Sequence, residues 1–209
     1  IWERRKAGLG VMANMKGDRK PVTLMEDTAI RVEFLPEYMD EIEALLAKYG
    51  KDAVFHAHIG SGELHIRPIL NLKDPEDVKL FRKIGLETAI LVKKYRGSLS
   101  GEHGDGRLRG EFIPVILGEH NYNLIKQVKE CWDPNGLLNP GKITGTPPMD
   151  TNLRYVPGTP TRDIKTIYDF SSSDGLIRAA ERCNGSADCR KSAIIGGTMC
   201  PSFMATGDE

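Results

Sequence analysis

Three of the five histidines in this chain lie within the ten-residue segment HAHIGSGELH, positions 56–65. A two-residue turn at Ser61–Gly62 would fold this segment into a hairpin, because glycine readily adopts the positive φ that tight turns need. The hairpin would place His58 opposite His65, with Cβ atoms roughly 4.5–5.5 Å apart. Two imidazoles at that separation could bind one divalent ion, so the spacing predicts a metal site.

Side chains along the two predicted strands alternate in direction and therefore divide into two faces. The apolar face contains Phe55, Ala57, Ile59, Leu64 and Ile66. The polar face contains His56, His58, His65 and Arg67, with His56 opposite Arg67. Two other interpretations stay open: a solvent-facing polar surface, and a catalytic histidine cluster without a metal. His56 is the weakest of the three as a ligand and could instead hold a ligand in place by hydrogen bonding.

A second group of reactive side chains lies in the glycine-rich segment SGEHGDGRLRG, residues 100–110. The Glu102 carboxylate could complete a two-histidine, one-carboxylate site with open positions for a substrate oxygen. His103 follows it directly and could act as a general base, because histidine titrates near neutral pH. Taken alone, the segment would favour a flexible turn with capping acids.

These side chains must be positioned by strands and helices, and the hydrophobic pattern predicts both kinds of element. Strands are expected at 21–34, 52–60 and 63–70, and helices at 36–50, 74–97 and 119–134. Asp74 is a plausible cap of the second helix, with Pro75 at its first position. The order of the elements favours an α+β fold with an antiparallel sheet.

The overall composition excludes several classes of protein. Lys plus Arg and Asp plus Glu both number 29, so the net charge of zero gives no indication of nucleic-acid binding. No apolar run approaches the ~20 residues of a membrane span. Four cysteines are too few for a disulfide scaffold, which favours a reducing, cytoplasmic setting. The chain begins at Ile1 and ends in ATGDE without a closing element, so we expect both ends to be cut.

The composition changes near Thr144, where the segment GTPPMDTNLRYVPGTPTRD is rich in Pro, Gly and Thr. We therefore expect a first domain at 1–143, an extended linker at 144–174 and a short helical tail at 175–209. Three of the four cysteines lie in this tail, namely Cys183, Cys189 and Cys200.

Three segments resemble, in the same order, the motifs of FAD-linked oxidases of the vanillyl-alcohol oxidase type. They are HIGSGELH (58–65), GEHGDG (101–106) and LLNPGK (137–142). The resemblance is to the C-terminal, substrate-side domain of the family and covers residues 1–143. D-Lactate dehydrogenases, the glycolate oxidase flavin subunit and D-2-hydroxyglutarate dehydrogenase belong to this family. The resemblance implies a ferredoxin-like antiparallel sheet with helices on one face.

The resemblance also implies roles for single residues. In the metal-dependent members, a divalent ion, usually zinc, is bound by residues that match His58, His65 and Glu102. The residue that matches His103 contacts the substrate and serves as the base. Arg5 resembles an arginine that binds the substrate carboxylate, a role that suits its two-pronged side chain. Lys20 is a second candidate for the same contact.

The flavin would be bound mostly by a domain that precedes this one in the family and that is absent from this chain. The third motif implies contacts to the cofactor from Asn139, Gly141 and Lys142. The chain departs from the family pattern at Ser61 and Glu63, where the pattern has Asp and Asn. The resemblance therefore leaves open what these two residues contact.

The cysteine tail resembles the start of the iron–sulfur half of large fused dehydrogenases, in which ferredoxin-type clusters follow an FAD-linked oxidase. Cys200–Pro201 is typical of the end of a ferredoxin ligand run. The spacing here is C-x5-C-x10-C, so the ligands would be Cys183, Cys189 and Cys200, with a fourth beyond Glu209. A zinc or free-thiol cluster is the alternative to a 4Fe-4S cluster.

Together these features predict a fragment of an FAD-dependent dehydrogenase that oxidises a D-2-hydroxy acid of the lactate, glycolate or 2-hydroxyglutarate type. Metal-assisted hydride transfer would reduce FAD, and electrons would leave through iron–sulfur clusters to an acceptor that the sequence does not identify. The fragment alone is expected to be inactive. A metal-binding structural module, an electron-transfer scaffold and a metallohydrolase are the alternatives. We expect a cytoplasmic protein, with peripheral attachment to a membrane left open.

Overall fold

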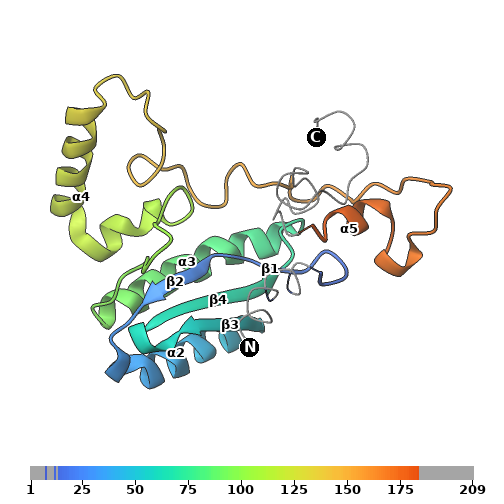
Figure 1. The fold of residues 1–209 in the computed structure, drawn as a ribbon, viewed down its shortest axis with the longest axis horizontal. Coiled ribbons are helices and arrows are strands. Elements are labelled where there is room, and N and C mark those ends of the chain that lie inside the picture. Colours follow the sequence, from blue (N-terminus) through green and yellow to red (C-terminus); the bar gives the residue numbers. More distant parts are fainter. Residues whose placement is uncertain (1–7, 9–11, 13, 184–209) are drawn as a thin grey trace, which may run out of the picture. The chain divides into compact units, whose positions relative to one another are not determined.

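The structure, a computed structural model, describes residues 8, 12 and 14–183. It divides into two compact units, one of residues 17–162 and one of residues 1–16 and 163–209. The first unit contains the sheet, the helices that cover it and the loops that follow the helices ending at residues 94 and 132 (Figure 1). This unit therefore holds all three of the motifs that begin at residues 58, 101 and 137.

β4 (Glu63–Leu70) is the central strand of the sheet. It pairs along one edge with β3 (Ala53–His58) and along the other with β2 (Met25–Ala29), while β1 (Lys20–Pro21) pairs with its C-terminal end. All of these pairings are antiparallel. The predicted α+β fold with an antiparallel sheet is therefore confirmed.

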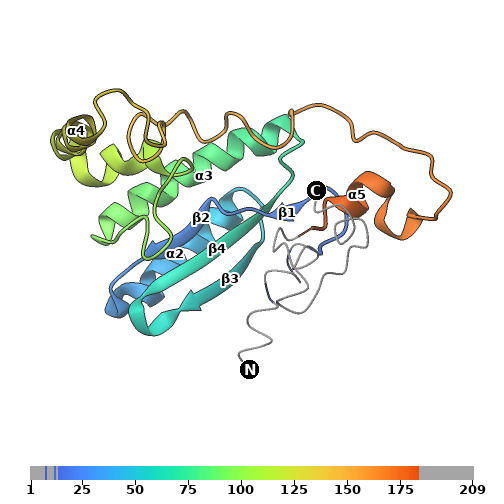
Figure 2. The same ribbon diagram turned by 45° about the horizontal axis from the view of Figure 1, so that its top comes forward.

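The helices α2 (Leu35–Lys48) and α3 (Pro75–Lys94) cover one face of this sheet (Figure 2). Their apolar side chains form one core with Leu64 and Ile66 of β4. Tyr38 and Ile42 of α2 and Ile84 of α3 are fully buried in it. The opposite face of β4 is left for the polar side chains that alternate with Leu64 and Ile66.

The helix boundaries follow from capping residues and proline. Asp74 caps α3, because its side chain accepts a hydrogen bond of 2.9 Å from the backbone N–H of Glu76. α4 (Ile113–Trp132) begins earlier than the predicted residue 119, since Pro114 fits the first turn of a helix. Gly118, with φ 79° and ψ 157°, interrupts it, which is why the sequence pattern indicated only the second half.

The single strand predicted at 21–34 is wrong. β2 ends at Ala29, and a 3-10 helix at Val32–Phe34 follows. Within β2 the pairing shifts between Glu26 and Thr28, and Asp27 has a φ of 77°. Asp27 is therefore the extra residue of a β-bulge, a feature that hydrophobic periodicity does not reveal.

The predicted hairpin turn is also wrong. A 3-10 helix at Ile59–Ser61 and left-handed Gly62 (φ 75°) replace the two-residue turn. His56 therefore lies opposite His65, and His58 lies opposite Glu63. The reason is that Gly62 packs against the segment that follows β2. There its carbonyl accepts a hydrogen bond of 2.8 Å from the N–H of Ile30. Because the register moves by two residues, the strand residues keep their predicted faces. Ile59 is the exception: the predicted strand 52–60 ends at His58, and Ile59 is 68% exposed in the 3-10 helix.

The segment expected to be a linker contributes one side chain to the core. Met149 is 1% exposed and belongs to the same apolar cluster as α3. Gly85 of α3 makes room for it, since a Cβ there would lie 2.9 Å from the Met149 sulfur. Residues near 149 thus belong structurally to the first unit.

In the second unit, the described elements are a 3-10 helix at Ser171–Ser173 and the short helix α5 (Leu176–Ala180). Cys183 is exposed near the end of the described residues. Cys189 and Cys200 lie outside them. Among the described helices, none has the length and apolar character needed to cross a membrane.

Candidate metal centre

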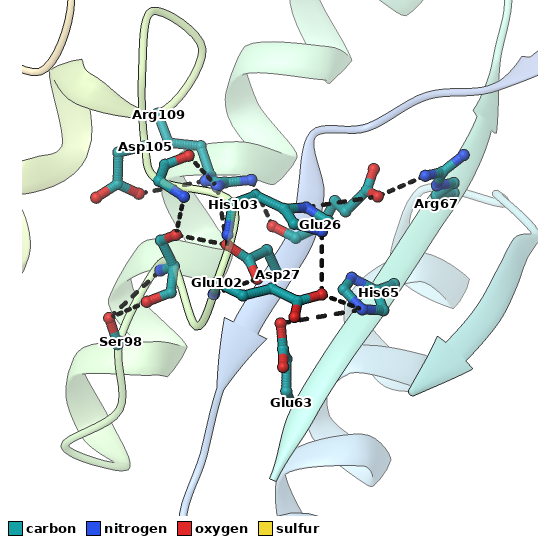
Figure 3. Close-up of polar contacts among 12 residues, drawn as sticks. Glu26, Asp27, Glu63, His65, Arg67, Ser98, Glu102, His103, Asp105 and Arg109 are labelled. Atoms are coloured by element: carbon teal, nitrogen blue, oxygen red, sulfur yellow. Dashed lines mark hydrogen bonds and ion pairs between the residues drawn. The ribbon is translucent and has the colours of Figure 1, made fainter. Parts of the chain in front are cut away.

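The polar face of β4 and the loop that follows α3 come together in one cluster of histidines and carboxylates (Figure 3). β4 supplies Glu63 and His65, and β3 supplies His58 beside them. Glu102 and His103 reach the same place from the loop. The loop is fixed at its start, because Ser98 forms a β-bridge with Ala29, at the end of β2.

The structure brings His58, His65 and Glu102 within reach of one ion. Glu102 Oε1 lies 3.4 Å from His58 Nε2 and 3.8 Å from His65 Nε2. One donor atom of each residue lies within 4.8 Å of the others. Bonds of about 2.0–2.2 Å to zinc place two ligands on opposite sides of an ion at most about 4.4 Å apart. Small movements of these side chains would therefore let them share one divalent ion.

His65 is in the chemical state that a metal ligand needs. Its side chain is buried, and burial is the main cause that holds the pKa of His65 below its ordinary value, with nearby His103 as the next cause. The imidazole is therefore neutral at physiological pH, which is the form that binds metals. Its Nδ1 is buried without a hydrogen-bond partner among the described residues. These features fit a metal ligand whose Nε2 points to Glu102.

His103 lies beside the three candidate ligands and remains partly exposed. Its Nε2 is 3.2 Å from Glu102 Oε1, and its Nδ1 is 3.8 Å from Glu26 Oε1. Its ring stacks on that of His65, with centroids 5.0 Å apart. Glu26 in turn forms an ion pair with Arg67. His103 is thus held by neighbours on both sides, while 43% of its side chain is exposed.

Asp27 holds the loop that carries Glu102 and His103, and sequence reasoning missed it. Its carboxylate is fully buried and accepts hydrogen bonds from the N–H of Glu102 (2.9 Å), the N–H of His103 (2.8 Å) and the Ser100 hydroxyl (2.5 Å). Arg109 lies 3.4 Å from it. Burial alone would raise the pKa of Asp27, but hydrogen bonds outweigh burial and hold that pKa well below its usual range. A charged residue inside a buried strand was the available signal.

Glu63 is the second residue that sequence reasoning did not place. Its carboxyl group is buried, and its Oε1 lies 4.0 Å from His65 Nε2. The hydrogen bond with Asp27, followed by burial and the charge of Glu102, raises the pKa of Glu63 to about 7. The centre therefore crowds carboxylates together more closely than they prefer without a cation.

His56 lies beside His65 but outside the groups of donor atoms just described, and Lys20 lies farther along the sheet. His56 is exposed and faces His65 with ring centroids 5.4 Å apart, but it belongs to none of the groups of donor atoms that could share an ion in the described residues. Lys20 pairs with Leu70, at the far end of β4 from Glu63. Arg5 lies outside the described residues.

The third motif lies in the turn after α4. Asn139 and Gly141 both have positive φ, of 49° and 70°, and Lys142 is partly buried. The N–H of Ile143, the next residue, donates a hydrogen bond of 2.8 Å to the carbonyl of Gly106. The end of the third motif is therefore attached to the end of the second.

The chain is similar to known proteins along its whole length. It is 36% identical over 216 residues to a D-2-hydroxyglutarate dehydrogenase of Pseudomonas putida, and this alignment covers 100% of this chain and 20% of that protein. It is 35% identical over 210 residues to the D-2-hydroxyglutarate dehydrogenase of Escherichia coli K12, covering 99% of this chain and 20% of that protein. The glycolate oxidase subunit GlcD of Bacillus subtilis is 25% identical over 143 residues, 68% of this chain and 30% of that protein.

The chain thus spans about a fifth of the length of these D-2-hydroxyglutarate dehydrogenases. Residues 1–143 match the family model of the C-terminal domain of FAD linked oxidases. That match contains the hairpin, the loop and the turn whose side chains have just been described. The chain belongs to the family of FAD-linked oxidases, as their C-terminal domain.

Proposed function

We propose that the whole protein oxidises a D-2-hydroxy acid, with FAD as the hydride acceptor. The relatives named above support this proposal, since two are D-2-hydroxyglutarate dehydrogenases and one is a glycolate oxidase subunit. The single observation in this chain that supports it best is the placement of Glu102 between two histidines and next to a third.

In this proposal His58, His65 and Glu102 hold a divalent ion, with zinc as the first choice. The ion would supply Lewis acidity toward the substrate hydroxyl, and a flavin bound mostly by a domain outside these residues would supply the hydride acceptor. The neutral state of His65 and its buried position support the assignment of ligands.

His103 removes the hydroxyl proton of the substrate. It is suited to this role because its Nε2 lies 3.2 Å from Glu102 and its side chain is partly exposed on the side where a substrate could enter. Glu26, 3.8 Å from the other ring nitrogen, would stabilise the charged imidazole that results. Arg5 would bind the substrate carboxylate through both oxygens, with Lys20 as the second candidate.

The proposal extends to the fold and to the cysteine tail. The strand order β3–β4–β2, with Ser98 bridged to Ala29 at the end of β2, supports a ferredoxin-like arrangement. Cys183, Cys189 and Cys200 would bind an iron–sulfur cluster that accepts electrons from the flavin one at a time. The alignment of the tail with D-2-hydroxyglutarate dehydrogenases over 99–100% of this chain supports a shared role for it.

The experiment uses the full-length protein purified with its flavin. Bleaching of the flavin absorbance under anaerobic conditions is followed after addition of D-2-hydroxyglutarate, D-lactate or glycolate. We expect His103→Ala to slow reduction by about 10²–10⁴-fold while the ion and the flavin remain bound. His120→Ala, at an exposed histidine of α4, is the matched control. Normal reduction in the His103 variant would refute the role of the base.

A non-catalytic metal-binding module is the second candidate. The buried Glu63 favours it, because a fourth protein ligand would close a tetrahedral site. In that case His103→Ala would leave flavin reduction unchanged, and removal of the ion would unfold the domain.

A further inference from the structure

Glu63 is the place where this chain differs from the family pattern inside the metal centre, since that pattern has Asn at this position. It begins β4 directly opposite His58. Only 7% of the residue is exposed, and Oε1 is buried without a hydrogen-bond partner among the described residues. A buried carboxylate oxygen in that condition needs a positive partner, because desolvating it costs free energy.

The position of this oxygen agrees with the positions of the candidate ligands. Glu63 Oε1 lies 4.0 Å from His65 Nε2, and Glu102 Oε1 lies 3.8 Å from the same nitrogen. One imidazole nitrogen therefore faces a carboxylate oxygen from β4 and another from the loop. His65 belongs both to the group of donor atoms with His58 and Glu102 and to a second group with Asp27 and Glu63. An ion bound to His65 would reach both carboxylates after a movement of the Glu63 or the Glu102 side chain.

The loop also holds the Glu63 side chain in place. A Cβ at Gly101 would lie 3.0 Å from Glu63 Cδ and 3.1 Å from Oε1. A larger residue at position 101 would push the Glu63 side chain by a few tenths of an ångström, so glycine lets the loop lie close to the carboxylate. Glu63 is thereby kept in the centre and cannot turn outward without moving the loop.

The two arginines of the centre are engaged by other carboxylates. Arg67 pairs with Glu26, and Arg109 lies 3.4 Å from Asp27 and 3.3 Å from Asp105. Glu63 itself lies 4.0 Å from His65 Nε2 and forms a hydrogen bond with Asp27. Among the described residues neither of these arginines pairs with Glu63, so a bound cation would compensate the carboxylates of Glu63 and Glu102 together.

We propose that Glu63 is a fourth protein ligand of the ion held by His58, His65 and Glu102. The inference rests on the proposed function, because it concerns the same ion. Four protein ligands leave no position on a tetrahedral ion, whereas a six-coordinate ion such as Mn²⁺ keeps two. Two adjacent positions would suit the hydroxyl oxygen and one carboxylate oxygen of a 2-hydroxy acid. Zinc is the first choice for the three-ligand site, and a second carboxylate would shift the preference of the site toward a hard ion such as Mn²⁺.

The test measures Mn²⁺ binding to the 209-residue chain after treatment with a chelator. Glu63→Gln keeps the size of the side chain and its hydrogen bond to Asp27 but removes the charged ligand. We expect its Mn²⁺ affinity to fall by at least about tenfold, since even indirect partners of metal ligands have effects of that size. Glu102→Gln is expected to lose the ion, and Glu41→Gln, on α2, is the control that keeps it.

The outcomes separate this inference from the proposed function. An unchanged affinity in Glu63→Gln, together with loss of the ion in Glu102→Gln, would overturn the inference and leave the three-ligand site intact. No binding by the wild-type chain would overturn both the metal centre and the inference. A crystal structure of the Mn²⁺-loaded wild-type chain gives the same answer without a variant: we expect a Glu63 oxygen bonded directly to the ion, and its absence there would overturn the inference.

Discussion

Asp27 binds the backbone N–H of His103 through a hydrogen bond of 2.8 Å, although the two residues are 76 positions apart in the chain. The same carboxylate accepts the N–H of Glu102, so one buried side chain sets the backbone of both loop residues. The candidate ligand and the candidate base are therefore positioned by β2, although neither belongs to the sheet.

The first prediction concerns the stability that Asp27 provides. Asp27→Ala would remove one of the two carboxylates beside buried Arg109, the other being Asp105, and would leave the backbone N–H groups of Glu102 and His103 without their acceptor. We expect the free energy of unfolding to fall by about 3–5 kcal/mol, as for other broken buried ion pairs. Urea denaturation of wild type and the variant measures this free energy of unfolding. The control Asp40→Ala, at an exposed site of α2, should change it by at most about 0.5 kcal/mol. Similar values for both variants would contradict the role of Asp27.

The second prediction separates two neighbouring histidines. We expect His65→Ala to lose the bound divalent ion, because His65 Nε2 lies among the candidate ligand atoms. His56→Ala should keep the ion, since His56 is exposed and lies outside those groups. Elemental analysis after reloading with zinc or manganese measures the content, and a thermal melt shows that each variant folds. Equal loss in both variants would mean that His56 is also a ligand.

The third prediction concerns the turn that sets the register of the hairpin. A Cβ at Gly62 would lie 1.9 Å from the Ile30 carbonyl oxygen, at a φ of 75°. We therefore expect Gly62→Ala to destabilise the protein by at least about 1–3 kcal/mol and to weaken binding of the ion. Gly60→Ala is the matched control, because a Cβ there meets nothing within 4 Å. Chemical denaturation and ion titration of both variants test this, and equal behaviour would contradict it.

The fourth prediction concerns pH and the turn after α4. Lys129, and then the N–H groups of Leu138 and Leu137, hold the pKa of Asp133 below its ordinary value of 3.8. A carboxyl group whose pKa is lowered by folding stabilises the folded state above the ordinary value, and this contribution is lost as the pH falls through the folded value.

Asp133→Asn should therefore be less stable than wild type at pH 6, and the difference should shrink as the pH falls below 3.8. Urea denaturation of both proteins over this range measures the difference. A difference that stays constant with pH would show that the hydrogen bonds of Asp133, and not its charge, stabilise the turn.

The sequence was sufficient to predict which residues share the polar face of the hairpin, but not which residues lie opposite one another. Face assignment depends only on alternation, and it survives a shift of two residues. The pairing depends on the turn, and the turn depends on Ile30, which follows β2 and is distant in the chain. His58 and His65 were therefore assigned to the right face, and Glu63 was overlooked opposite His58.

The sequence also could not reveal Asp27, because its partners are distant in the chain and its role comes from a bulge. Two adjacent acids in an apolar strand were a signal, but only the folded loop shows what they hold. The roles of Arg5, Cys189 and Cys200 stay predictions, since these residues lie outside the described part of the chain.

The bulge in β2 has a consequence for how this centre could be lost. In a regular strand, consecutive residues point to opposite faces, yet Glu26 and Asp27 both reach the polar face here. Met25 and Thr28, on either side, remain paired with the core residues Ile66 and Leu64. Removing the single codon for Asp27 would restore plain alternation and leave those core pairings in place. A one-residue deletion would thus remove the carboxylate that holds the backbone of Glu102 and His103, while the pairing of β2 with β4 on either side is kept.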